Sequence, residues 1–314
     1  MTLLKKKLGS TGLEVTVLGL GTVELGLEYG IGKKEIPSEQ TAITILKTAV
    51  DAGITYIDTA RGYGISEERI GKSGIGKIPG VVIGTKCGMP LEKGIDPHGD
   101  ELKQLIVCDV EESLRKLQTD SLQLLQLHYA TVEQIEHGEI TDILRELKES
   151  GKVQHVGIST RGEEAPLSAI KTNFFETLQL AHSIVDQRMT GNVMTEAMKN
   201  NVGIINRSVL LKGSLTPTRR EQLPEQLSVL KENSRKAEQV ATDLGMDLPT
   251  LAMRFVISNP AVSTALMGTT KPERITTTVS AVSAGPLPED ILVKLRDLAI
   301  ADPLQVDPAK WPAV

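Results

Sequence analysis

Short apolar runs alternate with longer segments of helical periodicity along most of the chain. The apolar runs cover residues 15–20, 54–59, 81–86, 122–128, 153–159, 177–181, 202–209 and 263–267. Helical patterns occupy 38–53, 66–70, 100–117, 140–150, 165–171, 190–199, 223–244, 249–259 and a last segment through Ile275 and Val282. This alternation is typical of a parallel sheet whose strands are joined by crossover helices. Eight such units close most naturally into an α/β fold of the (β/α)8 TIM-barrel type.

Residues 8–15 (LGSTGLEV) precede the first of these units. They place Gly-Ser-Thr-Gly between two short apolar flanks, which predicts an N-terminal β-hairpin that caps one end of the barrel. An open, doubly wound sheet is the alternative fold, but it rarely contains eight such regular units and leaves no obvious place for the hairpin. Ser38 and Ser66 are predicted to cap helix starts, and Gly53 to end a helix.

Composition narrows the class of protein. The 314 residues are 40% hydrophobic and 24% charged without a break along the chain, which favours a single barrel domain over 1–314. A net charge of -5 with no long basic run argues against a nucleic-acid partner. No run is apolar enough to span a membrane and no signal-type start is present, so we expect a cytoplasmic protein. Cys87 and Cys108 lack metal or disulfide spacing, and no metal is expected.

Polar side chains recur where the predicted strands end. Asp58 closes the second strand and Tyr63 follows on a glycine-flanked loop, while Lys86 closes the third strand and His128 the fourth. These strand ends meet at one mouth of a barrel. A lysine in an apolar strand needs an acidic partner, which predicts a pair between Lys86 and Asp58. The ammonium should then lower the pKa of Tyr63 and make it a proton donor near neutrality, while His128 hydrogen-bonds a carbonyl.

Each of these residues also has a structural interpretation when it is taken alone. Asp58 is then the cap of a turn, Tyr63 a half-buried aromatic residue, and His128 a strand-end histidine with its hydrogen bonds satisfied. Four such residues at consecutive strand ends are harder to explain by structure than by chemistry.

The chain resembles the aldo-keto reductases over nearly its whole length. The matching segments are LGLGT (18–22), DTARGYGISEERIGKS (58–73), IGTK (83–86), LLQLH (124–128), GKVQHVGIST (151–160), LQLAHS (178–183) and GTTKPERI (268–275). This resemblance implies that Asp58, Tyr63, Lys86 and His128 are a catalytic tetrad that reduces carbonyls with a nicotinamide cofactor.

The resemblance also implies where the cofactor lies. The residues expected to bind it are Gly21, Thr22, Asp58, Ser159, Thr160 and Gln179 near the nicotinamide, Arg207 and Ser208 beside the ring and pyrophosphate, and Gly268, Thr269, Lys271 and Arg274 at the adenosine phosphate. Thr160, Val209 and Thr278 depart from the residues common in the family. Lys271 and Arg274 begin a helix, where free amides and the dipole favour an anion, so we expect NADP(H) rather than NAD(H).

These points predict an NADP(H)-dependent oxidoreductase that acts on a small carbonyl or alcohol, with Tyr63 as proton donor. Two alternatives remain: a cofactor-binding regulatory subunit with little turnover, and a non-redox lyase or isomerase on the same barrel. The loops 24–36, 89–99, 129–139 and 211–224 should shape the pocket. The tail after Pro303, which carries Trp311, is expected to fold over the mouth. No oligomeric state is indicated.

Overall fold

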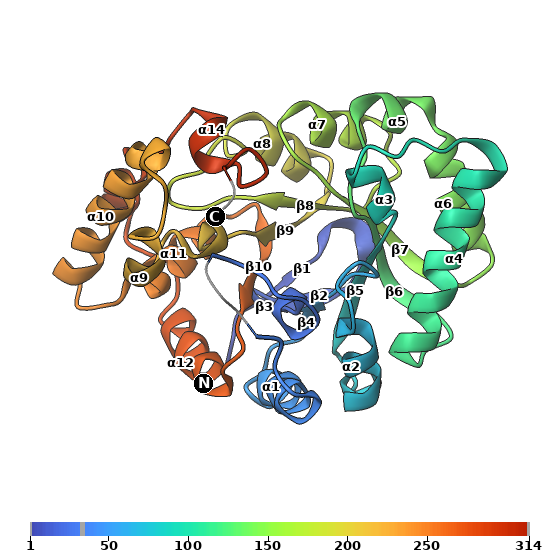
Figure 1. Ribbon diagram of the computed structural model, residues 1–314, viewed down its shortest axis with the longest axis horizontal. Helices are drawn as coiled ribbons and strands as arrows, with labels where there is room; N and C mark the ends of the chain where they lie inside the picture. Colours follow the sequence, from blue (N-terminus) through green and yellow to red (C-terminus); the bar gives the residue numbers. More distant parts are fainter. Residues whose placement is uncertain (1, 32–34, 313–314) are drawn as a thin grey trace.

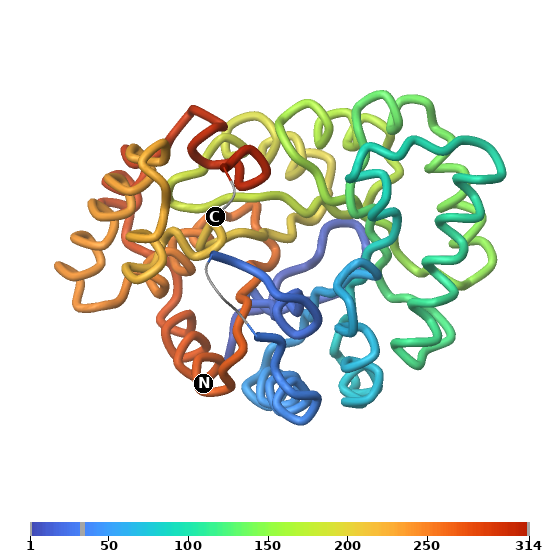
Figure 2. The backbone as a smooth tube through the Cα atoms, viewed as in Figure 1, coloured from blue at the N-terminus to red at the C-terminus, as the bar shows by residue number. Residues whose placement is uncertain are grey.

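Eight parallel strands close into a barrel, and helices surround it (Figure 1). Around the barrel the strands are β3 (Leu18–Gly21), β4 (Tyr56–Asp58), β5 (Val82–Cys87), β6 (Leu122–Leu127), β7 (Val153–Ser159), β8 (Thr177–Ala181), β9 (Gly203–Arg207) and β10 (Val262–Gly268). The barrel closes because β10 pairs with β3, with Ala265 beside Leu18. Figure 2 shows these two segments, one blue and one orange, running side by side. The predicted (β/α)8 fold is confirmed.

This computed structural model describes residues 2–31 and 35–312. Residues 32–34, within the predicted loop 24–36, lie outside the described residues. The helices are α1 (Glu39–Asp51), α2 (Ser66–Ser73), α3 (Met89–Glu92), α4 (Gly99–Leu117), α5 (Val132–His137), α6 (Glu139–Glu149), α7 (Glu164–Lys171), α8 (Asn192–Lys199), α9 (Pro217–Arg220), α10 (Ser228–Asp243), α11 (Leu248–Ile257), α12 (Pro272–Ser283), α13 (Glu289–Arg296) and α14 (Pro303–Val306). Within these ranges, no helix is both long and apolar enough to cross a membrane.

The N-terminal hairpin is present, but its boundaries differ from the prediction. Strands β1 (Lys5–Lys7) and β2 (Glu14–Thr16) pair antiparallel, and the predicted residues 8–15 are mostly the connection between them. The first apolar run, 15–20, therefore divides between the hairpin and the barrel strand β3. The chain turns between them, where the Val17 amide donates to the Leu4 carbonyl at 2.9 Å.

The predicted caps agree with the structure at one helix and differ at another. Ser38 caps α1, since its hydroxyl accepts from the Thr41 amide. The Ser66 cap is wrong: Ser66 is the first residue of α2, and its hydroxyl bonds the Thr22 hydroxyl at 2.7 Å instead. The short helices α3 and α5 occupy segments predicted as loops.

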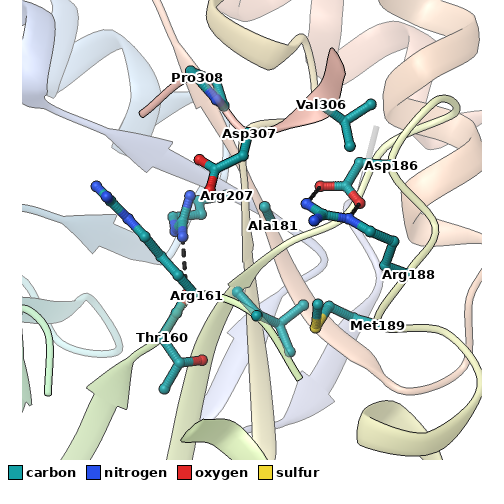
Figure 3. Close-up of a pocket in the computed structure, with 12 residues that line it drawn as sticks. Thr160, Arg161, Ala181, Asp186, Arg188, Met189, Arg207, Val306, Asp307 and Pro308 are labelled. Carbon is teal, nitrogen blue, oxygen red and sulfur yellow. Dashed lines mark hydrogen bonds and ion pairs between the residues drawn. The ribbon is translucent and has the colours of Figure 1, made fainter. Parts of the chain in front are cut away.

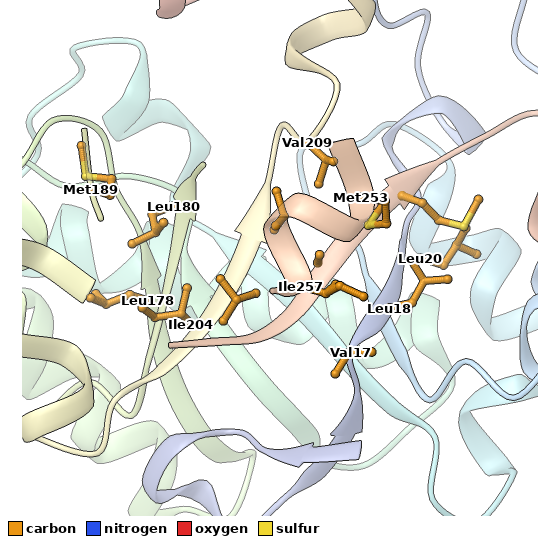
Figure 4. Packing of buried hydrophobic residues seen from close by; sticks show 14 of the residues in the cluster. Val17, Leu18, Leu20, Leu178, Leu180, Met189, Ile204, Val209, Met253 and Ile257 are labelled. Atoms are coloured by element: carbon orange, nitrogen blue, oxygen red, sulfur yellow. The ribbon is translucent and has the colours of Figure 1, made fainter. Parts of the chain in front are cut away.

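The hydrophobic core has two parts. The larger part lies between the barrel and its helices, as Figure 4 shows for β3, β8, β9 and α11. The smaller part fills the barrel interior and joins Leu8 and Val15 of the hairpin region to Tyr56 and neighbouring strand residues. A Cβ atom on Gly84 would lie 2.3 Å from the Tyr56 hydroxyl, so glycine at this position lets the ring fill the interior. The hairpin region thus closes the amino-terminal end of the barrel and leaves the opposite end for chemistry.

Candidate active site

Consecutive strands carry the predicted tetrad to one end of the barrel. Asp58 is the last residue of β4, Lys86 lies one residue before the end of β5, and His128 directly follows β6. Tyr63 lies on the loop between β4 and α2, where its amide donates to the Ala60 carbonyl at 2.9 Å and so fixes a turn. The structure therefore brings the four side chains together, as expected for carboxyl ends of barrel strands.

A buried ion pair forms the floor of this site. Lys86 Nζ lies 2.7 Å from Asp58 Oδ2 and donates to the Thr59 carbonyl at 2.9 Å. The Gln179 amide donates to the other carboxylate oxygen, Asp58 Oδ1, at 2.6 Å. The two charged side chains are 0% and 3% exposed. Burial lowers the pKa of the Lys86 ammonium, and Asp58 opposes that change. The predicted pair is therefore present, with both carboxylate oxygens satisfied.

Tyr63 lies directly over the buried pair. Lys86 Nζ is 4.9 Å from the centre of the Tyr63 ring. The pKa of the Tyr63 phenol is nevertheless raised above its ordinary value, first by burial and then by Asp58, while Arg207 opposes the shift. The expectation that Lys86 would lower this pKa is wrong, because Asp58 neutralises the ammonium and burial penalises the phenolate. The phenol therefore stays protonated at neutral pH.

His128 forms the adjacent wall of the site. Its ring is edge-to-face with Tyr63 at 5.6 Å between centroids. Burial, together with Lys86, Arg207 and Arg161, lowers the pKa of His128 to about 3. Its Nδ1 atom is buried and has no hydrogen-bond partner among the described residues. His128 is therefore a neutral imidazole at physiological pH.

Two residues expected near a nicotinamide form hydrogen bonds with Asp58. The Thr22 hydroxyl donates to the Asp58 carbonyl at 2.8 Å, and Gln179 holds the Asp58 carboxylate as described above. Gly21 ends β3 and Ser159 ends β7, both at the mouth of the barrel.

A second polar group lies beside the tetrad, around Arg207 at the end of β9. Arg207 donates to the Thr160 carbonyl at 2.9 Å (Figure 3). It also donates to the Ser208 hydroxyl at 3.4 Å. Ser208 adopts a left-handed φ of 64°. The Thr160 hydroxyl is buried without a hydrogen-bond partner in the described structure. A buried hydroxyl and a half-buried guanidinium at the barrel mouth fit a polar ligand that carries amide and phosphate groups.

The tail lies against this group. Val306, Asp307 and Pro308 line a cavity together with Arg161 and Arg207 (Figure 3). The Trp311 indole donates to the Gln305 carbonyl at 3.1 Å, so Trp311 stabilises the tail itself. The tail segment after Pro303 therefore reaches the mouth, as predicted.

The third predicted group, after β10, lies at the start of α12. Gly268 ends the strand, Thr269 is buried, and the Thr269 hydroxyl accepts from the Lys271 amide at 3.0 Å. Lys271 precedes the first turn of α12 and Arg274 lies within it; both are exposed. No ion pair within residues 2–31 and 35–312 engages either side chain. Both cations are therefore available to an anion at this helix start.

Comparison with known proteins identifies the chain. The model of the Aldo/keto reductase family matches residues 17–300. The chain belongs to this family. It is therefore an oxidoreductase of the carbonyl and alcohol class, and the family uses nicotinamide cofactors.

Relatives of this aldo/keto reductase cover nearly the whole chain. The uncharacterized oxidoreductase YqkF of Bacillus subtilis (strain 168) is 29% identical over 93% of this chain and 95% of its own length. The NADH-specific methylglyoxal reductase of Escherichia coli (strain K12) is 27% identical, with 89% and 93% covered. Among solved structures, the holo form of aldo-keto reductase AKR11C1 from Bacillus halodurans has a TM-score of 0.79 at 28% identity, with 96% and 97% covered.

The structure of this aldo/keto reductase also shows two charged residues at the mouth that the sequence did not suggest. Glu92, at the end of α3, forms an ion pair with Arg161, two residues after β7. Arg161 belongs to the same class of strand-end polar residues as the tetrad, and that position was the available signal. Glu92 lay inside a segment predicted as loop, so no pattern distinguished it from a solvated acid.

Proposed function

We propose that this chain is an NADP(H)-dependent reductase of aldehydes or ketones in which Tyr63 gives its proton to the carbonyl oxygen. The observation that supports this most directly is the convergence of the buried Lys86–Asp58 pair, Tyr63 and His128 at one barrel mouth. A binding protein has no evident use for a buried ion pair below a phenol.

The side chains would divide the chemistry among them. NADPH, when bound, supplies the hydride that reduces the carbonyl carbon. Neutral His128 donates a hydrogen bond to the carbonyl oxygen and orients it toward Tyr63. Tyr63 remains protonated until the oxygen becomes basic, because its pKa is raised. Lys86, 4.9 Å from the ring, holds Asp58 in place below the phenol. Arg207, which opposes the rise in the Tyr63 pKa, favours the phenolate as the proton leaves. For the oxidation of an alcohol, the same groups would act in the reverse direction.

The cofactor would be held by the residues that surround this mouth. The partnerless Thr160 hydroxyl suits the carboxamide, while Arg207 and Ser208 suit the ring and pyrophosphate. Lys271 and Arg274 suit the 2′-phosphate of NADP, since both are exposed at the amino end of α12. One relative is named as NADH-specific, so the preference for NADP rests on these two cations rather than on the fold.

The test is single-turnover reduction of a simple aldehyde at saturating NADPH. Replacing Tyr63 with Phe removes one oxygen, so folding and NADPH binding should persist while reduction falls about 10²–10⁴-fold, the usual contribution of a positioned acid. Tyr129→Phe makes the same chemical change at the same mouth and should have little effect. If Tyr63→Phe retained more than about a tenth of the parent rate, Tyr63 would not be the donor. Steady consumption of NADPH by the parent would also exclude the regulatory and non-redox alternatives.

A further inference from the structure

The Glu92–Arg161 ion pair joins the end of α3 to the loop after β7 across the mouth. Glu92 Oε1 bonds Arg161 Nη2, and 69 positions of sequence separate the two residues. The Arg161 guanidinium also lies over the Tyr129 ring, 5.9 Å from its centroid. The Glu92 side chain is 21% exposed and that of Arg161 is 41% exposed. Arg161 therefore holds the inner partner, Glu92, at a defined place above the tetrad.

The second carboxylate oxygen of Glu92 faces the reaction site. Glu92 Oε2 lies 3.8 Å from His128 Nε2, which is beyond hydrogen-bond length. No hydrogen bond in the described parts of the chain uses this oxygen. The charge of Glu92 also contributes to the raised pKa of Tyr63, so it lies close to both residues that would bind a carbonyl oxygen.

The position of Glu92 Oε2 determines which substituent it meets. A carbonyl oxygen bound by His128 lies about 3 Å from Nε2. Glu92 Oε2, 3.8 Å from the same imidazole nitrogen, is then the acceptor beside the bound oxygen, on the side where a substituent of the neighbouring carbon can lie. An ionised carboxylate only accepts hydrogen bonds. It therefore binds a hydroxyl there, gains nothing from a methyl group and repels a second carboxylate.

We propose that Glu92 is a specificity-determining residue that accepts a hydrogen bond from a hydroxyl on the carbon adjacent to the carbonyl. Arg161 is the positioning residue that orients Glu92. The preferred substrate class is then an α-hydroxy aldehyde or ketone. This inference rests on the proposed carbonyl reduction and adds the recognition of the neighbouring carbon.

The experiment compares hydroxyacetone with 2-butanone. Both are methyl ketones, and 2-butanone has a methyl group where hydroxyacetone has its hydroxyl. The measured quantity is the ratio of their kcat/KM values in the parent and in Glu92→Leu. Intrinsic reactivity and the fraction of active enzyme cancel when this ratio is compared between variants. We expect the ratio to fall roughly 10- to 150-fold in Glu92→Leu, the factor for one hydrogen bond to a charged group.

Several further variants make the result specific. Glu92→Gln keeps an acceptor oxygen without charge, and its ratio should fall only roughly three- to tenfold. This variant also tests the inference if Glu92→Leu fails to fold. Arg161→Met should lower the ratio and Arg161→Lys should restore part of it. Glu146→Leu removes an acid that pairs with Lys103 on the outer helices and should leave the ratio unchanged.

The outcomes separate this inference from the proposed function. Failure of the parent to reduce any carbonyl would contradict the proposed function itself. Reduction of both ketones with a ratio that changes less than about threefold in both Glu92 variants would overturn the specificity role alone. A parent preference for pyruvate over hydroxyacetone would also overturn it, since Glu92 should repel that carboxylate.

Discussion

Lys86→Met is expected to destabilise the fold through Asp58 rather than through lost packing. Met has nearly the length of Lys and suits a buried strand position. Asp58 Oδ2, however, would lose its partner at 2.7 Å while remaining buried, and the Thr59 carbonyl would lose its donor at 2.9 Å. Only the bond from Gln179 to Oδ1 would remain. Removing one member of a buried pair costs about 3–5 kcal/mol of unfolding free energy.

A double variant and a surface control test this reasoning. Asp58→Asn combined with Lys86→Met removes the uncompensated charge and should recover most of the loss, because neutral replacement of a buried pair is often tolerated. Lys72→Met breaks pairs with Glu39 and Glu68 that are exposed to solvent, so its effect should be much smaller.

The assay is equilibrium unfolding in urea, followed by circular dichroism. With a slope of about 3 kcal/mol per molar urea, the Lys86→Met midpoint should fall by about 1–1.7 M. The double variant should return most of the way to the parent midpoint. If Lys86→Met and Lys72→Met gave equal small shifts, or if the double variant were no better than Lys86→Met, the buried pair would not control the stability of this site.

Three further outcomes are expected. Arg274→Ala should weaken NADPH binding by about 1.5–3 kcal/mol in a fluorescence titration and barely change NADH binding; equal affinities of the parent for both would contradict the phosphate role. Truncation after Asp302 removes Asp307 and Pro308 from the mouth and should change KM across a carbonyl panel while NADPH binding persists; an unchanged panel would show that the tail only packs. His128, with a pKa of about 3, should show no imidazole titration by NMR between pH 5 and 8. The pKa of His128 in the folded protein lies below its unfolded value of about 6.5, so the folded protein should lose stability as the pH falls from about 6.5 toward 3. The His128→Gln variant should show a weaker dependence of stability on pH in this range.

The regular strands were readable from the sequence because both of their faces are buried. Val153–Ser159 and Thr177–Ala181 have the predicted limits, since each apolar run ends where the strand leaves the barrel. The run 15–20 was misread because hydropathy does not reveal a turn within an apolar segment. Helix α5 was missed although Thr131 and Gln134 form a capping box at its start. A helix of six residues is too short to show its periodicity.

The candidate site was predictable as far as strand order brings residues together. Asp58, Lys86 and His128 come from three neighbouring strands, so a barrel alone predicts that they meet. The direction of the Tyr63 pKa shift was not predictable, since it depends on how burial compares with a neutralised ammonium. The contact between Glu92 and Arg161 was not predictable from the sequence, because it depends on the positions of the short helix α3 and of the loop after β7.

Closure of the barrel through β3 and β10 has a consequence for synthesis of the chain. β3 ends at Gly21 and its closing partner β10 begins at Val262. At 5–20 residues per second, roughly 12–50 s pass between the appearance of the two strands. During that interval one edge of β3 has no native partner, and an unpaired edge is a template for pairing with another chain. The four tetrad residues have all been made by His128, long before that edge is covered. We therefore expect the nascent chain to be most vulnerable to aggregation after these four residues exist and before β10 emerges.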